Sequence, residues 1–283
     1  MAILTMAQLT LREAGRRKLL LSVALLTLVL IPAIAWGFSF VPGLCANRHQ
    51  AASQCRPVEA GLLILVAYMF SFIIAVAAPF IAAPALSGDI ESHTILAVLA
   101  RPMRRAEYVI GRWLGLAILL VAYTGGTCSL EFLGIDISVG YVVPHPLLAT
   151  VCIMGEAMCL MTLALLASTR LAPITGGIST IILFGTAWIA GIAVQIGAAL
   201  GQSAIADVGT VSSMLLPTDG FWRAALFNME PVSMVAVLNA TREASADPFG
   251  VAAPPSAAYI VWAIAWIGLV LAGAIWSFSR REV

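Results

Sequence analysis

The chain has 283 residues, of which 61% are hydrophobic and only 10% are charged. Soluble domains carry about 25% charged residues, so this composition excludes an ordinary water-soluble globular protein. The formal net charge of +1 shows no basic excess of the kind that a nucleic-acid-binding face requires, so we expect no nucleic-acid partner.

The first predicted element is an amphipathic helix over residues 1–18. Apolar and polar side chains are interleaved there, as is typical of a helix that lies along a membrane surface. The apolar residues are Ile3, Leu4, Met6, Leu9 and Leu11, and the polar ones are Gln8, Arg12, Glu13 and Arg16. The basic residues 16–18 and the Ala-Ile-Ala at 33–35 also resemble a secretory signal with its cleavage site. The apolar run continues to Phe40, which is long enough to span a membrane, so we interpret it as a transmembrane helix.

Long unbroken apolar runs follow one another along the whole chain. A helical span needs about 20 apolar residues, whereas barrel strands are alternating segments of about 10 residues. Six runs approach or exceed the helical length: Leu19–Phe40, Ala60–Leu86, Trp113–Leu130, Pro146–Thr169, Leu171–Leu200 and Ala257–Ser279. We expect the third to start before Trp113, and Glu156 is the only charge expected within a span. The sequence therefore predicts an all-α polytopic membrane protein with six spans in a single transmembrane domain over residues 1–283.

The distribution of basic residues predicts the orientation. Six spans place both chain ends on one side of the membrane, and the segments on that side hold eleven basic residues against four in the opposite segments. The eleven are Arg12, Arg16, Arg17, Lys18, Arg101, Arg104, Arg105, Arg112, Arg170, Arg280 and Arg281, and the four are Arg48, Arg56, Arg223 and Arg242. The positive-inside rule therefore predicts that both termini are cytoplasmic.

Two of the five cysteines, Cys45 and Cys55, lie in the first predicted outer loop. An oxidising exterior permits a disulfide between them, and closing so short a loop stabilises a fold by about 2–3 kcal/mol. The other three fall within predicted spans, where small apolar packing is the simplest interpretation. No spacing resembles a zinc or iron–sulfur site.

A polar cytoplasmic segment, residues 87–112, separates the second and third predicted spans. Ser87 is a candidate N-cap, and Asp89 and Glu91 lie in the first turn, where carboxylates suit the helix dipole. An apolar face follows at Ile95, Val98 and Leu99, and Pro102 disfavours helical geometry at the residue before it. We therefore expect a short helix, and then a second helix that runs through Glu107 and Arg112 into the third span. An ordinary surface loop is the alternative interpretation.

Later features of the chain suggest further roles. Glu156 lies near the middle of the fourth span, where a carboxylate is expensive; it is either a structural acid or part of a substrate path or coupling site. Gly197 and Gly201, at the outer end of the fifth span, allow close helix approach and a contact between two chains, although this spacing is common by chance. Residues 207–256 form a long outer segment, whose apolar pieces at Val211–Pro217 and Val232–Ala240 are too short to cross the membrane. We expect re-entrant or surface helices there.

The sequence also excludes some catalytic chemistry. The only lysine, Lys18, stands outside any G-x-x-x-x-G-K-[ST] pattern, so the chain has no phosphate-binding loop. The Gly-Ile-Ser at 177–179 would suit an intramembrane serine protease only beside a general base. The three histidines, His49, His93 and His145, all fall in predicted loops. We therefore expect a non-catalytic chain with no cofactor of its own.

The cytoplasmic segment resembles the signature of type-two ABC (ATP-binding-cassette) exporter permeases. The resemblance rests on Asp-Ile-Glu at 89–91, Thr-Ile at 94–95, Leu-Ala-Arg-Pro at 99–102, Arg-Arg at 104–105 and Gly-Arg-Trp-Leu-Gly at 111–115. A second stretch, Leu-Pro-Thr-Asp-Gly-Phe-Trp-Arg at 216–223, resembles the outer segment of some members. The chain departs from the signature at 92–94, where Ser-His-Thr replaces a common glycine pair, and at Arg101, where serine is usual.

The resemblance implies that this chain is the permease subunit of an exporter in a bacterial or archaeal cell membrane. It implies a second permease chain, the same or related, and two copies of a separate ATPase that bind ATP and Mg²⁺. It further implies that the short cytoplasmic helix contacts the ATPase. The residues that it assigns to this coupling are Asp89, Glu91, Ile95, Val98, Leu99, Arg104 and Arg105. The alternative from the residues is a secondary transporter driven by an ion gradient.

Overall fold

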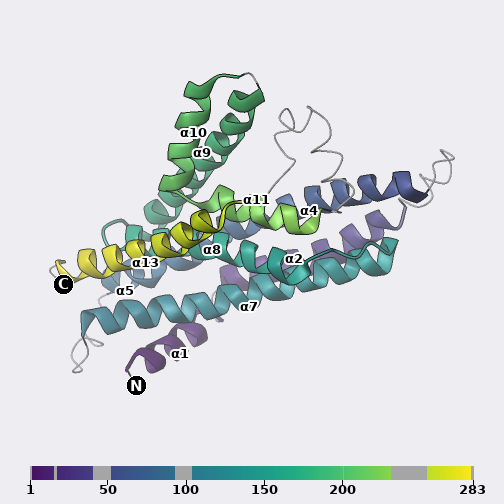
Figure 1. Ribbon diagram of the computed structural model, residues 1–283. Helices are drawn as coiled ribbons and strands as arrows, with labels where there is room; N and C mark the ends of the chain where they lie inside the picture. The colour runs from purple at the N-terminus through teal and green to yellow at the C-terminus, as the bar shows by residue number, and fades with distance from the viewer. Residues whose placement is uncertain are drawn as a thin grey trace.

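The structure, a computed structural model, describes residues 2–15, 18–40, 52–92, 104–199, 201–230 and 254–281. These residues form α-helices and one short 3-10 helix, and no strand occurs among them. The elements are α1 (Ala2–Ala14), α2 (Lys18–Phe38), α4 (Ala52–Ala82), η1 (Ala83–Ala85), α5 (Ser87–Glu91), α7 (Arg105–Val139), α8 (Pro146–Ser168), α9 (Pro173–Ala199), α10 (Ser203–Leu215), α11 (Thr218–Met229) and α13 (Ala257–Ser279) (Figure 1).

Six stretches of helix are long and apolar enough to cross a membrane. They are Leu21–Phe38, Gly61–Glu91, Arg105–Val139, Pro146–Ser168, Pro173–Val194 and Ala257–Ser279. The predicted all-α fold with six membrane-spanning helices is therefore confirmed. The third span starts before Trp113, as expected, but α7 also continues past Leu130 to Val139.

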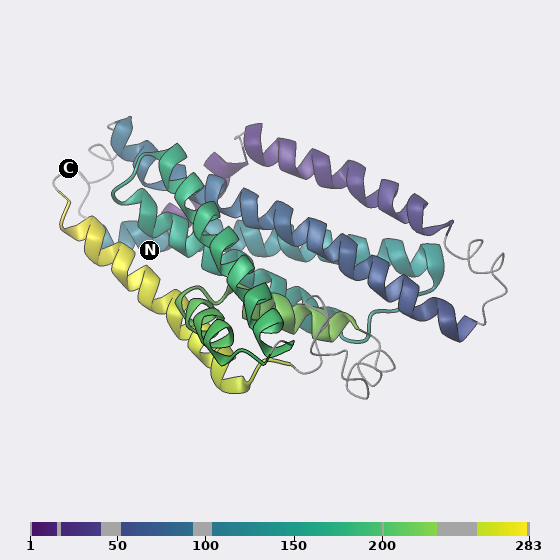
Figure 2. The same cartoon turned by 90° about the horizontal axis from the view of Figure 1, so that it is seen from above.

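Elements from several parts of the chain meet at one end of the bundle, which we call the terminal end. Figures 1 and 2 show α1, α5, the start of α7 and the end of α13 gathered there. Arg105, at the start of α7, donates hydrogen bonds to the carbonyls of Ser279 at 3.0 Å and Arg281 at 2.7 Å. This arrangement agrees with the even number of spans, which places both chain ends on one side.

The helix α8 occupies the interior of the bundle and contacts α4, α7, α9, α11 and α13. Apolar side chains from these helices fill the core, including Leu63 and Phe70 on α4 and Leu120 on α7. In contrast, α2 and α13 lie at the rim and expose large apolar side chains such as Leu28 and Val261. Such surfaces are expected where a helix contacts lipid.

The N-terminal helix α1 packs closely against the start of α7. Its buried residues include Met6 and Thr10, which lie against Gly111 and Gly115 of α7, respectively. A Cβ atom at Gly115 would lie 2.6 Å from the Cβ of Thr10 and 2.8 Å from the carbonyl oxygen of Ala7, and one at Gly111 would lie 2.5 Å from the Cβ of Met6. Only glycine therefore permits this helix contact. The location of α1 along the membrane surface stays a prediction.

We expect Gly115→Val to separate α1 from α7, because the new side chain would overlap Thr10 and the backbone of Ala7. Overpacking of this kind typically costs about 1–3 kcal/mol, which should lower the midpoint of thermal unfolding and speed proteolysis of the N-terminal segment. Gly126→Val is the matched control on the same helix, since nothing lies within 4 Å of a Cβ at Gly126. Equal effects of the two substitutions would mean that the glycine contact does not hold α1.

The predicted outer segment is helical where the structure describes it. The helix α10 folds back against α9 through a turn at Gly201, whose φ of +66° is a conformation that glycine adopts without strain. Figure 1 shows α9 and α10 as a pair that projects from the bundle. The next helix, α11, turns inward and packs against α8, with Phe221 and Trp222 buried. The expected short helix at Val211–Pro217 is wrong in its bounds, because α10 starts at Ser203 and ends at Leu215; residues 232–240 lie outside the described residues.

Candidate functional site

The start of the predicted coupling segment is helix α5, which continues the helical path of α4 and η1. The expectation that Ser87 caps this helix is wrong. Its N-cap is Leu86, whose backbone is already helical, and Ser87 instead donates a side-chain hydrogen bond to the carbonyl of Ala83 at 2.7 Å. Residues 93–103 lie outside the described residues, so the predicted apolar face at Ile95, Val98 and Leu99 stays a prediction.

Asp89 on α5 belongs to a charge cluster that joins three helices. Arg112 on α7 forms an ion pair with Asp89 and another, at 2.5 Å, with Glu13 on α1. The hydroxyl of Tyr108 also donates a hydrogen bond to Asp89. Arg112 is buried, with 6% of its surface exposed, and charges at buried positions are usually paired in this way. Asp89 therefore anchors α5 to α7 within the chain, and its part in a contact with an ATPase stays a prediction.

The remaining coupling residues that the structure describes divide into two kinds. Glu91 and Arg104 are exposed, and the backbone N–H of Arg104 donates to the side chain of Glu107 at 3.0 Å, which caps α7. Arg105 instead binds the carbonyls at the end of α13. Among the described coupling residues, Glu91 and Arg104 thus remain open to a partner, whereas Asp89 and Arg105 hold the terminal end together.

The sequence did not reveal that Arg112 is the residue that joins this cluster. The sequence placed Arg112 in the helix that leads into the third span, in the stretch that carries the resemblance and among eleven cytoplasmic basic residues, but gave it no partner. The sequence did contain two candidate partners for Arg112. Glu13 lies in the amphipathic helix, and Asp89 lies just after the second predicted span. Which acid would meet which base depends on how the three helices cross, and the spacing within one segment does not specify that.

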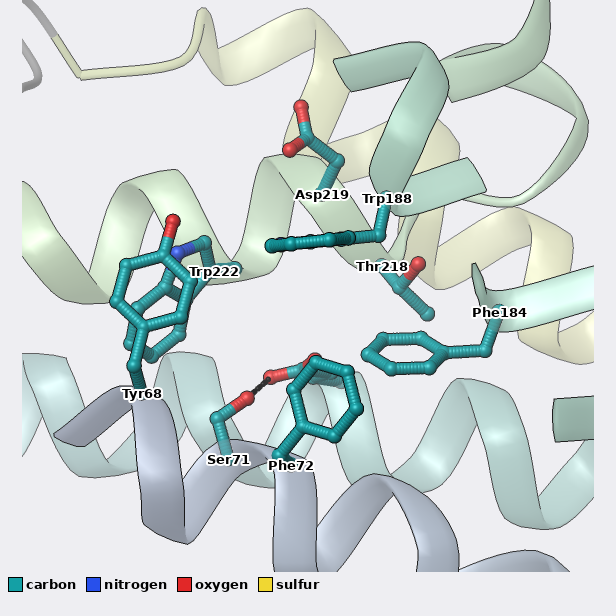
Figure 3. Close-up of a pocket in the computed structure, with 9 residues that line it drawn as sticks. Tyr68, Ser71, Phe72, Phe184, Trp188, Thr218, Asp219 and Trp222 are labelled. Carbon is teal, nitrogen blue, oxygen red and sulfur yellow. Dashed lines mark hydrogen bonds between the residues drawn. The ribbon is translucent and has the colours of Figure 1, made fainter. Parts of the chain in front are cut away.

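A second candidate site surrounds Glu156, near the middle of α8. Glu156 is buried, with 2% of its surface exposed. Ser71 on α4 donates a hydrogen bond from Oγ to Glu156 Oε2 at 2.8 Å (Figure 3). None of the ion pairs found among the described residues includes Glu156. In the described part of the chain, this acid therefore has no basic partner of the kind that buried acids in a membrane usually have.

A small cavity lies beside Glu156, where α4, α8, α9 and α11 meet. We call this cavity and its walls the Glu156 chamber. It is lined by Tyr68, Ser71, Phe72, Glu156, Phe184, Trp188, Thr218, Asp219 and Trp222 (Figure 3). The cavity offers about 10 Å³ to the centre of a water molecule, which is room for roughly one water. In this conformation the cavity itself therefore has room for a group of about that size.

Aromatic rings make up much of the chamber wall. Phe72 on α4 makes edge contacts with Phe184 and Trp188 on α9, with ring centroids 5.6 and 5.9 Å apart. On the other side, the rings of Tyr68 and Trp222 lie 4.2 Å apart. The sequence predicted Glu156 as a candidate site residue but none of these rings, because they come from three separate helices.

The other carboxylate at the chamber is already paired. Asp219, in the first turn of α11, accepts a hydrogen bond from Arg223 Nε at 2.7 Å. Arg223 also donates to the carbonyl of Gly191 on α9 at 3.0 Å, which fixes α11 against α9. The charge of Asp219 is thus compensated, whereas that of Glu156 is not matched by an ion pair in the described part of the chain.

The prediction that Glu156 is the only charge within a span is wrong. The helix α7 also carries Arg112 and Glu131, and Glu131 is buried with 4% of its surface exposed. The apolar run on which the third span was based ends at Leu130, so Glu131 was assigned to the outer loop. Its buried neighbours at helical spacing, Cys128 and Ile135, were the available signal that the helix continues.

The predicted disulfide cannot be placed. Cys45 lies outside the described residues, and so does the side chain of Cys55, although the backbone of Cys55 belongs to α4. The three cysteines within spans, Cys128, Cys152 and Cys159, are free thiols. The pairing of Cys45 with Cys55 stays a prediction.

The glycines proposed for a contact between chains lie at the C-terminal end of α9 and in the turn that follows it. Gly197 is buried and its carbonyl accepts a hydrogen bond from the N–H of Gln202 at 2.9 Å, while Gly201 forms the turn into α10. The turn gives Gly201 a role within the chain. A contact with a second chain at these residues stays a prediction.

The chain matches a known protein family. The family model described as ABC-2 family transporter protein matches residues 10–283, which is nearly the whole chain. A search of curated proteins found no match.

Proposed function

Because this chain belongs to the ABC-2 family of transporter proteins, we propose that it is the membrane-spanning permease subunit of an ABC exporter, driven by a separate ATPase subunit. The observation that carries the proposal is the match over residues 10–283, which covers all six candidate spans. The family is one of membrane transport components, and an ABC ATPase is its general partner.

The terminal end of the bundle is the surface that suits the ATPase best. There, α5 is held to α7 through Asp89 and Arg112, and Arg112 also binds Glu13 on α1. A force applied to residues that follow α5 would therefore reach both α7 and α1. The exposed side chains of Glu91 and Arg104 flank this surface and supply charged contacts for a partner.

In the proposed complex, two permease chains, the same or related, assemble with two ATPase subunits that bind ATP and Mg²⁺. Both termini face the cytoplasm of a bacterial or archaeal cell, and cargo moves outward. One observation favours a second candidate, a transporter driven by an ion gradient: both Glu131 and Glu156 are buried within spans, and intramembrane acids of this kind commonly serve proton coupling.

Copurification tests the proposal. The full chain, tagged and extracted in mild detergent, should carry with it an ATPase in equal amount, and the pair should hydrolyse ATP. The same preparation from cells that lack that ATPase is the control. A chain that purifies alone and moves cargo only while an ion gradient is maintained would support the gradient-driven alternative.

We expect Glu156→Gln to reduce transport-coupled ATP hydrolysis much more than it reduces stability. Glutamine nearly reproduces the shape of the side chain and can still accept the hydrogen bond from Ser71, which is 2.8 Å long in the wild type. Expression and the thermal unfolding midpoint should therefore stay near wild type. Turnover should fall by about tenfold or more, the size of effect expected when cargo can no longer make a charge-assisted hydrogen bond to this side chain. Wild-type turnover in the variant would leave Glu156 a structural residue only.

A further inference from the structure

We propose that the Glu156 chamber binds the ammonium group of an amphiphilic organic amine, with the apolar body of the ligand directed outward past Phe72. This inference rests on the proposed function, since it names a substrate class for the exporter. Four features of the chamber support this proposal. They are a buried acid without a basic partner and a buried hydroxyl without a hydrogen-bond partner, both among the described residues, together with the aromatic walls and the apolar surroundings.

The first feature is a buried acid that has no basic partner among the described residues. The chamber holds two carboxyl groups, Glu156 and Asp219, and the charge of Asp219 is matched by Arg223. Glu156 has Ser71 as a hydrogen-bond donor and, among the described residues, no ion pair. A cation that entered the chamber would supply the partner that a carboxylate at this depth otherwise lacks.

The second feature is the side chain of Thr218, the first residue of α11. It is 1% exposed, and its Oγ1 has no hydrogen-bond partner among the described residues. Buried polar atoms are rarely left in this state, and each one calls for a water, an ion or a ligand group. An ammonium group has several N–H donors and no acceptor, so a group bound to Glu156 keeps donors for a second oxygen, and Thr218 Oγ1 is the candidate on the chamber wall.

The third feature is the ring of aromatic faces. Phe72, Phe184 and Trp188 surround one side of the cavity, and Tyr68 and Trp222 the other (Figure 3). Aromatic faces attract organic cations, most strongly where water is excluded. The available space, about 10 Å³ for the centre of a water molecule, suits a group about as large as one water, which is also the size of an ammonium head.

The fourth feature is the route outward. Phe72 is 43% exposed at the edge of the chamber, and Met69 and Val76, about one turn before and after it on α4, are also exposed apolar residues. A ligand whose ammonium group reaches Glu156 would thus place the rest of its body against apolar side chains. A hard inorganic cation prefers a shell of oxygen ligands, and the mainly aromatic walls do not provide one.

Equilibrium binding to the full chain in lipid nanodiscs, without any ATPase, tests the proposal. The probe is radiolabelled n-octylamine, and the competitors are unlabelled n-octylamine, n-octanol and octanoate, which share the tail but differ in charge. Octylamine should bind saturably and be displaced by unlabelled octylamine, whereas octanol and octanoate at the same concentration should displace little. Equal displacement by octanol would show partition into an apolar surface and would overturn the proposal.

Matched variants locate the site. Glu156→Gln and Thr218→Val should each weaken octylamine binding, the first by at least about tenfold, as expected for loss of a hydrogen bond to a charged group. Glu131→Gln removes a buried acid that does not line the chamber and should bind as the wild type does. Wild-type affinity in Glu156→Gln would contradict the assignment. Because no ATPase is present, failure here leaves the permease function standing, and failure of ATPase copurification leaves amine binding standing.

Discussion

Replacing Arg112 by methionine is expected to destabilise the terminal end of the bundle by about 3–5 kcal/mol, the usual consequence of removing one partner from a buried ion pair. Methionine keeps most of the length of the side chain but leaves the carboxylate of Asp89 without its cation. The side chain of Asp89 is only 15% exposed, so water cannot fully replace the lost partner. Arg112 also holds Glu13, so α1 should loosen as well.

The midpoint of thermal unfolding in detergent measures this loss, and a second substitution tests its cause. In the double variant Arg112→Met with Asp89→Asn, neither residue is charged, and Tyr108 can still donate a hydrogen bond to the new amide. Much of the lost stability should therefore return. If the double variant is less stable than Arg112→Met, Asp89 is not stabilised mainly by Arg112, and the proposed anchoring of α5 fails.

The largest effect on function is expected from Val98→Asp combined with Leu99→Asp. Both residues lie outside the described residues, so this prediction rests on the sequence, which places them on an apolar face of the coupling segment that follows α5. Exposed apolar faces usually mark binding surfaces. Two carboxylates forced into such an interface would be desolvated without partners, so association with the ATPase should weaken by at least about a hundredfold.

The control for this variant is Val142→Asp, a change of the same chemistry in the connection between α7 and α8. Val142 is 71% exposed and lies away from the terminal end, so this variant should bind the ATPase as the wild type does. Both proteins should purify with wild-type yield and unfolding midpoint. Normal assembly and ATP hydrolysis in the double variant would remove the coupling role from residues 87–112.

The sequence predicted the architecture well because the membrane imposes a simple rule on it. Every backbone polar group must form its hydrogen bond within the span, so each long apolar run predicts one helix. The predicted end of the last span, Ser279, agrees with the structure. The same rule explains the error in α7. Its continuation to Val139 keeps Glu131 buried inside the protein, and a hydropathy criterion does not recognise a helix that buries a charge.

The candidate site was only partly predictable, since its geometry depends on which helices meet. Glu156 stood out because a lone acid in an apolar span is unusual. Its surroundings come from α4, α9 and α11, and α11 reaches the chamber only because it turns inward against α8. Likewise, Asp89 was assigned to the partner surface from its place in a resemblance, but the crossing of α5 and α7 pairs it with Arg112. Such pairings depend on tertiary packing and are not encoded in local spacing.

We propose above that ATP hydrolysis by a separate subunit drives transport through the six spans of this chain. The most direct measurement is the rate of ATP hydrolysis in proteoliposomes. Three samples are compared: the purified ATPase alone, the ATPase with the wild-type chain, and the ATPase with the Val98→Asp, Leu99→Asp variant. Each is measured with and without ionophores that collapse ion gradients. We predict that the wild-type chain binds the ATPase and changes its rate of ATP hydrolysis. With the variant, the rate should equal that of the ATPase alone. Ionophores should leave all three rates unchanged. An ATPase whose rate is the same with and without the wild-type chain, together with cargo movement that ionophores abolish, would contradict the claim.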